Sequence, residues 1–322
     1  MHRIKHWAAA FTASSIVALA MPAKADPWPQ RTVRLIVPFA AGSDAAARAF
    51  AEQLAKRWKQ PVVIENRPGA EGMIGVSAFT GMKDDHVLFY FSAAPITTFP
   101  LLHARLTYDP ARDIVPISSA AEPVISVSVS ESLNTNSLDA LVALARAQPG
   151  KLNYYAFNGG SFAILLPGFV KSAGLDMVQV SYRDGSLGIQ DLVAGRIHVM
   201  MSSLLISLPL ARAGKLRLLA VTNKNRAAIA PEIPTAIEAG YPQLEFEGLQ
   251  GFFGPQGMPA ERQDRIAADI RAVAADPAVA EPLAAGAYFA RASTPAEFAT
   301  AIEAQRAQLA SLARLAGIRP AP

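Results

Sequence analysis

The sequence predicts an α/β protein with two lobes, each a mainly parallel sheet flanked by helices, and three observations support this fold class. Short apolar runs alternate with helical patterns along most of the chain. Several of these runs are almost continuously apolar, which is typical of parallel strands covered on both faces. The 322 residues are enough for two cores, and no low-complexity linker separates them. Extended segments should therefore join the lobes and leave a cleft between them.

The first third of the chain predicts three strands and two helices. The run VRLIV at 33–37 is a strand, and the helical pattern at 44–58 follows it. A second strand is expected at 62–65, a short helix at 72–80 and a third strand at 87–91. This strand–helix–strand order is that of a parallel sheet with crossover helices.

The same alternation resumes after residue 124. Strands are expected at 124–129, 154–156, 178–181, 199–201 and 216–221. Helices are expected at 137–147, 160–173, 185–195 and 203–213. This middle part of the chain therefore predicts a second sheet covered by its own helices.

The chain is almost wholly helical after the segment 246–254. A helix is expected from Pro259 to Ala274, since proline is favoured in a first turn. Thr294, followed by Pro295 and Glu297, matches a capping box at the start of the last helix. That helix is amphipathic and should pack on the surface of one lobe. Its apolar residues at helical spacing are Phe298, Ile302, Leu309, Leu312 and Leu315.

Two crossings between the lobes are expected, near 124–130 and 246–254. With these crossings, the first lobe is formed by both ends of the chain, residues 26–126 and 249–322. The second lobe is the middle of the chain, residues 127–248. A molecule with paired crossings can close by hinging.

The first 25 residues predict a cleavable export signal. Arg3 and Lys5 precede an apolar run at 7–21, and Ala23-Lys24-Ala25 offers the small residues of a cleavage site. Because these residues hold three positive and no negative formal charges, their removal lowers the net charge from +4 to +1. A near-neutral mature chain without a basic block predicts no nucleic-acid partner and no membrane insertion after cleavage.

The chain contains no cysteine. Disulfides, thiol catalysis and thiolate metal sites are therefore excluded, and packing alone must hold the fold.

Three loops between a strand and a helix are candidate binding sites, because free N–H groups at helix starts favour an anion. In the first loop, Phe39, Ala41 and Gly42 precede Ser43 and Asp44, either of which can cap the helix. A plain capped turn is the alternative.

The second and third loops lie in the predicted second lobe. Asn158 and Ser161 flank two glycines and could form an anion nest. Tyr182, Arg183, Asp184 and Gly185 form the third loop, where Arg183 could clamp a carboxylate or simply pair with Asp184.

Enzyme sites find little support in the sequence. After the signal, His86, His103 and His198 lie in three different elements without metal-ligand spacing. The Asp84-Asp85-His86 segment is expected to be a solvated turn. The glycines at 69–75 have the spacing GxxGxxG, which does not predict a dinucleotide site, and no GxSxG motif is present. We therefore expect no cofactor, no metal and no catalytic residue.

Several motifs, in a shared order over most of the chain, resemble the Bug-type (TctC-like) substrate-binding proteins of tripartite tricarboxylate transporters. They are Trp28-Pro29, 31–39 (RTVRLIVPF), 60–69 (QPVVIENRPG), Ile74-Gly75, 106–110 (LTYDP), 149–154 (PGKLNY), 213–222 (AGKLRLLAVT), 231–240 (PEIPTAIEAG) and 251–255 with Gly257 and Pro259.

The resemblance implies a type II-like periplasmic binding-protein fold that is monomeric and closes on a small carboxylate. It implies that the loops at 39–44 and 182–186 grip the ligand, and that Ser92 and the 158–161 loop line the cleft. The first loop is two residues shorter than the usual family pattern. Ser202-Ser203 stands where many relatives have Asp-Asn, so we expect a ligand without an ammonium group, either a dicarboxylate or an aromatic acid.

Three functions follow as hypotheses. The first is a periplasmic receptor that delivers its ligand to membrane transporter subunits. The second is a sensor that presents the ligand to a signalling receptor. The third is a carboxylate-dependent hydrolase on the same fold, since a fold does not determine function.

Overall fold

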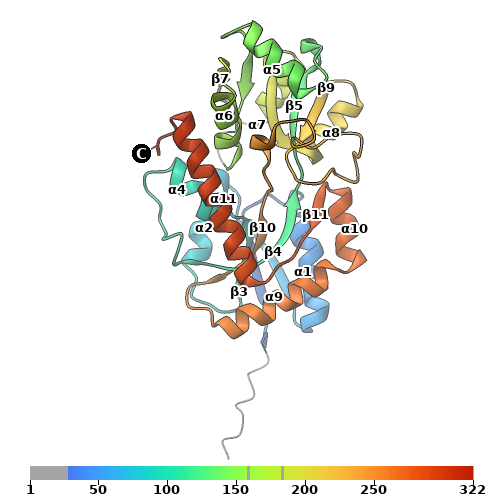
Figure 1. Ribbon diagram of the computed structural model, residues 1–322. Coiled ribbons are helices and arrows are strands. Elements are labelled where there is room, and N and C mark those ends of the chain that lie inside the picture. The colour runs from blue at the N-terminus through green and yellow to red at the C-terminus, as the bar shows by residue number, and fades with distance from the viewer. Residues whose placement is uncertain (1–27, 158–159, 183–184, 322) are drawn as a thin grey trace, which may run out of the picture.

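The computed structural model describes residues 28–157, 160–182 and 185–321, and it has two α/β lobes stacked end to end (Figure 1). The first lobe holds a six-stranded sheet in the order β11-β4-β10-β3-β1-β2. Its strands are β1 (Val33–Val37), β2 (Val62–Asn66), β3 (Val87–Ser92), β4 (Ile114–Pro123), β10 (Gln250–Pro255) and β11 (Tyr288–Ala290). Its helices are α1 (Ala45–Trp58), α2 (Met73–Thr80), α3 (Ala94–Thr97), α4 (Phe99–Leu102), α9 (Ala260–Ala274) and α10 (Pro277–Ala285).

The second lobe holds a five-stranded sheet in the order β7-β6-β8-β5-β9. Its strands are β5 (Ile125–Ser130), β6 (Asn153–Tyr155), β7 (Val178–Val180), β8 (Val199–Ser203) and β9 (Leu216–Val221). Its helices are α5 (Leu138–Ala147), α6 (Phe162–Ser172), α7 (Gly185–Val193) and α8 (Leu204–Arg212). The two-lobed α/β class predicted from the sequence is confirmed.

Both sheets are mixed, not mainly parallel as expected, and the strands that cross between the lobes explain the difference. β1 pairs in parallel with β2 and β3, whereas β10 is antiparallel to both of its neighbours. β6 likewise pairs in parallel with β7 and β8, whereas β5 is antiparallel to β8 and β9. β5 and β10 are the strands that enter a lobe from the other lobe. They must therefore run opposite to strands whose carboxyl ends face the cleft.

The apolar run of β1 shows why apolar and polar residues do not alternate along a parallel strand that is buried on both faces. Leu35 and Val37 pack into one core cluster, on the α1 and α9 side, whereas Ile36 packs into another with Val76 and Phe79 of α2. All of these side chains are buried. Burial of each is worth about 1.5–3 kcal/mol, which holds the sheet between two helical layers.

Besides β10, which lies in a segment expected only as an extended crossing, two strands were missed in the sequence analysis. β4 reads IVPISSAAEP, where a proline and small polar residues hide a ten-residue strand that is nevertheless central in the sheet. β11 has only three residues and lies in a part of the chain predicted to be helical. In both cases pairing with neighbouring strands outweighs local propensity.

The last helix, α11 (Pro295–Ala316), contacts both lobes rather than the surface of one (Figure 1). Phe298 and Ile302 are buried in a core cluster of the first lobe, whereas Leu309 and Ala313 are buried in the core of the second. The predicted capping box is present: the Glu297 N–H donates to Thr294 and the Thr294 N–H to Glu297. The division of the chain at 126/127 and 248/249 stays a prediction, and α11 contacts both sides of it.

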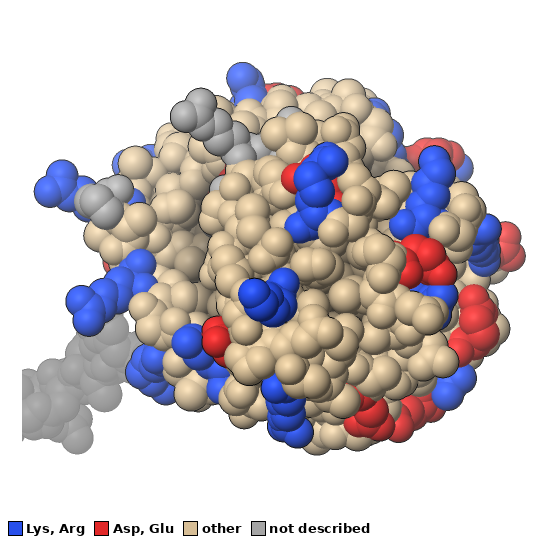
Figure 2. Space-filling model, turned by 90° about the horizontal axis from the view of Figure 1, so that it is seen from above, with Lys and Arg blue, Asp and Glu red and all other residues tan. Residues whose placement is uncertain are grey.

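The surface carries charges of both signs, and Figure 2 shows them interspersed over the upper face with uncharged surface between them. In the part of the chain that the structure describes, no helix combines the length and apolarity needed to cross a bilayer.

A buried carboxylate lies where the chain passes between the lobes. Glu122 is the last residue but one of β4, its side chain is 9% exposed, and its Oε2 has no hydrogen bond. Arg291 Nε lies 3.5 Å from it, and Arg291 also lies 3.7 Å from Glu247, which Lys224 approaches to 3.5 Å. Burial and the charge of Glu247 raise the pKa of Glu122 to about 7 against the weaker pull of Arg291 and Lys224.

We predict that Glu122 makes the protein less stable as the pH rises from about 4.5 to about 7, because the unfolded chain loses this proton first. The loss is roughly 3 kcal/mol and is complete above pH 7. Glu122→Gln should remove it and be the more stable protein at pH 8, but not at pH 4.5. Urea unfolding across this range measures the difference, with the exposed Glu303→Gln as control. If the free energy of unfolding changed with pH in the same way for wild type and Glu122→Gln, the raised pKa of Glu122 would be contradicted.

Candidate ligand-binding site

A cavity of about 240 Å³ lies between the two lobes. Residues after β1 and β3 form one wall, and the starts of α6 and α8 form the opposite wall, with both crossings between them. The lining residues are Phe39, Ser92, Ala93, Ala94, Thr97, Thr98, Pro123, Ile125, Gly160, Ser161, Phe162, Ser203, Phe246, Gly248, Leu249, Gln250, Tyr288 and Gln305. None of these described residues carries a formal charge.

Two helices begin at this cavity. Ser161 precedes α6 and Ser203 precedes α8, and neither serine caps its helix with a side-chain hydrogen bond. The first N–H groups of a helix have no partner within it, and its positive end favours a negative charge. Neutral donors and two helix starts can therefore hold an anion without a buried cation.

The loop after β1 is held from within by a buried carboxylate. Asp44 accepts hydrogen bonds from Arg48, from Asn66 Nδ2 at 2.8 Å and from the Gly42 N–H at 3.1 Å. Asn66 Nδ2 also donates to the Phe39 carbonyl. Burial acts to raise the pKa of Asp44, but these hydrogen bonds outweigh it and hold the pKa below its usual value. The loop is thereby fixed, and Phe39 is placed against the cavity.

Four of the residues predicted from the sequence meet in the cavity: Phe39, Ser92, Ser161 and Ser203. Ala41, Gly42 and Ser43 lie on the exposed part of the first loop. Asp44 and Ser202 are buried, and Ser202 contacts Ser126 and its neighbour Ser203. Asp44 therefore positions the loop rather than facing the cavity.

The second and third predicted loops are only partly described. Asn158, Arg183 and Asp184 lie outside the described residues. The Tyr182 hydroxyl donates to Asp191, and its ring packs edge-on against Tyr155. Gly185 begins α7, where any Cβ would overlap the ring of Phe157.

The sequence analysis missed the lining that comes from the crossings and from the C-terminal part. Phe246, Gly248 and Gln250 belong to a segment that was expected to cross between the lobes, so their place beside the cleft could have been inferred. Gln305 gave a subtler signal, because it is a polar residue on the buried stripe of α11. Tyr288 gave none, since β11 itself was missed.

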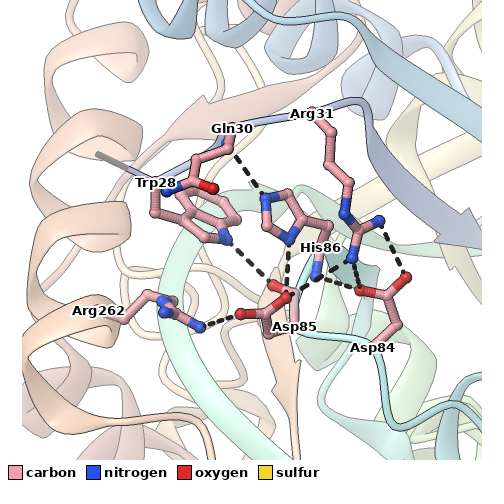
Figure 3. Close-up of polar contacts among 7 residues, drawn as sticks. All are labelled: Trp28, Gln30, Arg31, Asp84, Asp85, His86 and Arg262. Atoms are coloured by element: carbon pink, nitrogen blue, oxygen red, sulfur yellow. Dashed lines mark hydrogen bonds and ion pairs between the residues drawn. The ribbon is translucent and has the colours of Figure 1, made fainter. Parts of the chain in front are cut away.

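The Asp84-Asp85-His86 segment is not the solvated turn that we expected. His86 is buried, and its Nε2 accepts a hydrogen bond from the Gln30 N–H at 3.2 Å (Figure 3). Nδ1 must then carry the ring proton, and it donates to Asp85 at 2.7 Å. Both ring nitrogens are therefore engaged within the protein.

The two aspartates of this cluster are engaged as well. Asp84 receives two hydrogen bonds from Arg31, and Asp85 pairs with Arg262 at 2.5 Å (Figure 3). Ligand atoms of the three residues lie within 4.8 Å of one another, as they would around a metal ion. These contacts instead tie the segment before β1 to β3 and α9, at the amino end of β3 and away from the cavity.

The chain matches the family model of the tripartite tricarboxylate transporter family receptor over residues 46–312. It belongs to this receptor family. The match covers the whole second sheet and every strand of the first sheet except β1.

Individual relatives agree with this membership. A UPF0065 protein of Bordetella bronchiseptica is 30% identical over 316 residues, which cover 95% of this chain and 92% of that protein. Protein BugT of Bordetella pertussis is 32% identical and covers 74% of this chain and 75% of its own length. The solved structure of Rpa4515 of R. palustris with adipate has a TM-score of 0.80 at 30% identity, covering 91% of this chain and 100% of that one. The receptor resemblance and the binding-protein fold are confirmed.

We predict that Asp44→Ala destabilises this receptor by about 3 kcal/mol, because it leaves Asn66, Arg48 and the Gly42 N–H without their shared acceptor. Arg48→Ala should cost only about 1 kcal/mol, since the Arg48 side chain is half exposed. Ser43→Ala, in the exposed loop beside it, should change the stability by less than about 0.5 kcal/mol. Urea unfolding at pH 7 compares the three. Equal losses for Asp44→Ala and Ser43→Ala would contradict the anchoring role.

Proposed function

We propose that this receptor binds a small carboxylate without an ammonium group between its lobes and delivers it to the membrane subunits of a tripartite tricarboxylate-type transporter. It would act in the periplasm as a monomer, after removal of residues 1–25. The observation that supports this most is the cavity between the lobes, whose described lining combines two helix starts and neutral donors with no carboxylate.

The absence of a lining carboxylate is the basis for excluding an ammonium group. A buried ammonium without a partner costs several kcal/mol, so a site without an acidic residue rejects amino acids. Ser203 lines the cavity. An acid or an amide at this position could pair with an amine of the ligand, whereas the serine carries no negative charge. Among the described lining residues, no side chain is acidic.

Apolar groups in the lining support a ligand with a hydrocarbon body. Phe39, Phe162, Phe246 and Leu249 contribute to the cavity wall, and burial of ligand carbon against them is favourable. The structural relative with adipate carries a dicarboxylate of this kind, a chain of methylenes between two acids. A dicarboxylate or an aromatic acid fits this chemistry.

We predict that carboxylates, and not their amino analogues, raise the melting temperature of the exported protein. A ligand at ~100 times its Kd stabilises by roughly 2.7 kcal/mol, which a thermal-shift assay detects. The panel pairs each acid with its amino analogue, such as succinate with aspartate and adipate with 2-aminoadipate. Aromatic acids and neutral amides complete it.

The amino analogues should bind at least ~100-fold more weakly than their partners, as expected for an unpaired buried charge. Tighter binding of aspartate than of succinate would overturn the exclusion of an ammonium group. No shift with any acid would overturn the carboxylate receptor itself.

A further inference from the structure

Two polar side chains meet on the first-lobe wall of the cavity. Gln250 begins β10 and Tyr288 begins β11, and both line the cavity. β4 lies between these strands, with Ala121 opposite Gln250 and Pro123 opposite Tyr288. Directly opposed residues share a sheet face, as do residues two apart on one strand. All four side chains therefore lie on one face, and the short Ala121 leaves room for Gln250 and Tyr288 to meet across β4.

Tyr90 sets the direction of the hydrogen bonds that the Gln250 side chain makes. This tyrosine is fully buried, and its hydroxyl donates to Gln250 Oε1 at 3.2 Å. The amide oxygen of Gln250 thus faces Tyr90, and its NH₂ group is left to donate to Tyr288. Burial raises the pKa of Tyr288, and the Gln250 side chain acts to lower it. A hydrogen bond donated to the phenol oxygen stabilises the phenolate and so lowers the pKa.

This chain of bonds leaves the Tyr288 proton available. Tyr90 donates to Gln250 and Gln250 donates to Tyr288, so the Tyr288 oxygen serves as an acceptor. Within the described ranges, no protein acceptor takes the Tyr288 hydroxyl proton. A half-buried hydroxyl that lines a cavity and keeps its proton is a donor for whatever fills that cavity.

We propose that Tyr288 is a specificity-determining residue that donates a hydrogen bond to a second carboxylate of the ligand, opposite the carboxylate held by the second lobe. The inference rests on the proposed carboxylate-receptor function and narrows it to dicarboxylates. Ser161 and Ser203 lie on the second-lobe wall and Tyr288 on the first. One ligand with an acid at each end joins the two walls, so its second acid stabilises the closed form.

The test compares adipate with hexanoate, which has the same carbon chain and lacks the second acid. Isothermal titration calorimetry gives the Kd of both acids for wild type and for Tyr288→Phe. Wild type should prefer adipate. Tyr288→Phe should weaken adipate by roughly 10- to 100-fold, the range for a hydrogen bond to a charged group, and leave hexanoate unchanged.

Tyr154→Phe is the matched control. Tyr154 is a buried tyrosine of the second lobe, and its hydroxyl also donates to a glutamine, Gln179, at 3.2 Å. It does not belong to the cavity lining, so its loss should change neither Kd. Gln250→Met serves as a second variant, because it removes the group that positions Tyr288. It should weaken adipate less than Tyr288→Phe does and leave hexanoate unchanged.

The outcomes separate this inference from the function on which it rests. An unchanged adipate affinity in Tyr288→Phe, or an equal loss for both acids, overturns the role of Tyr288 while the carboxylate receptor stands. If wild type binds neither acid, dicarboxylates of four to eight carbons are compared with their monocarboxylates in the same way. If no carboxylate of any length binds, the proposed function fails, and the inference fails with it.

Discussion

The close contact between the two crossings is the constraint on which the rest of the structure depends. Pro123 ends β4, where the outgoing crossing begins, and Gly248 lies in the returning crossing. A Cβ on Gly248 would lie 2.6 Å from the Pro123 ring, so only glycine allows the two segments to pack this closely. Because the chain passes twice through one narrow place, β5 and β10 must enter their sheets against the direction of their neighbours. The carboxyl ends of the strands beside them, β3 and β4 in one sheet and β8 and β9 in the other, then face the cleft from both sides.

The same narrow place brings polar groups together that are distant in sequence. Gln305 of α11 donates to the Glu247 carbonyl and accepts from the Thr97 hydroxyl, which links both lobes through one buried amide. Glu122 lies beside Glu247 on the other side of the crossing. α11 completes the arrangement, since its first half packs on the first lobe and its second half on α6. The two crossings, the cavity and the last helix therefore form one structural unit.

The sequence revealed most of the fold because strands such as β1 and β9 consist mainly of apolar residues, and this composition predicts buried strands. Both were predicted with their observed bounds. It revealed less of the site, because a cavity wall depends on which segments meet in space. Phe39 and Ser161 could be found from loops that precede helices, a local pattern. Tyr288 could not be found, because its place follows from pairing with a strand more than 160 residues earlier.

Local composition also misled where tertiary contacts decide. Asp84, Asp85 and His86 look like an exposed turn in the sequence, but Arg31 and Arg262 from distant segments pair with the two aspartates, and the histidine is buried. Asp44 looked like a ligand-binding cap and instead holds its own loop. A polar side chain at a loop thus has two possible roles, and only its partners tell them apart.

The central claim is that an anion is held between the lobes by neutral groups and helix starts. A crystal structure of the protein grown with the tightest-binding acid of the thermal-shift panel tests this most directly. We expect ligand density between Ser161 and Ser203 on one wall and Tyr288 on the other, with the lobes closed on it. Density at another surface, with this cavity holding only solvent, would contradict the account.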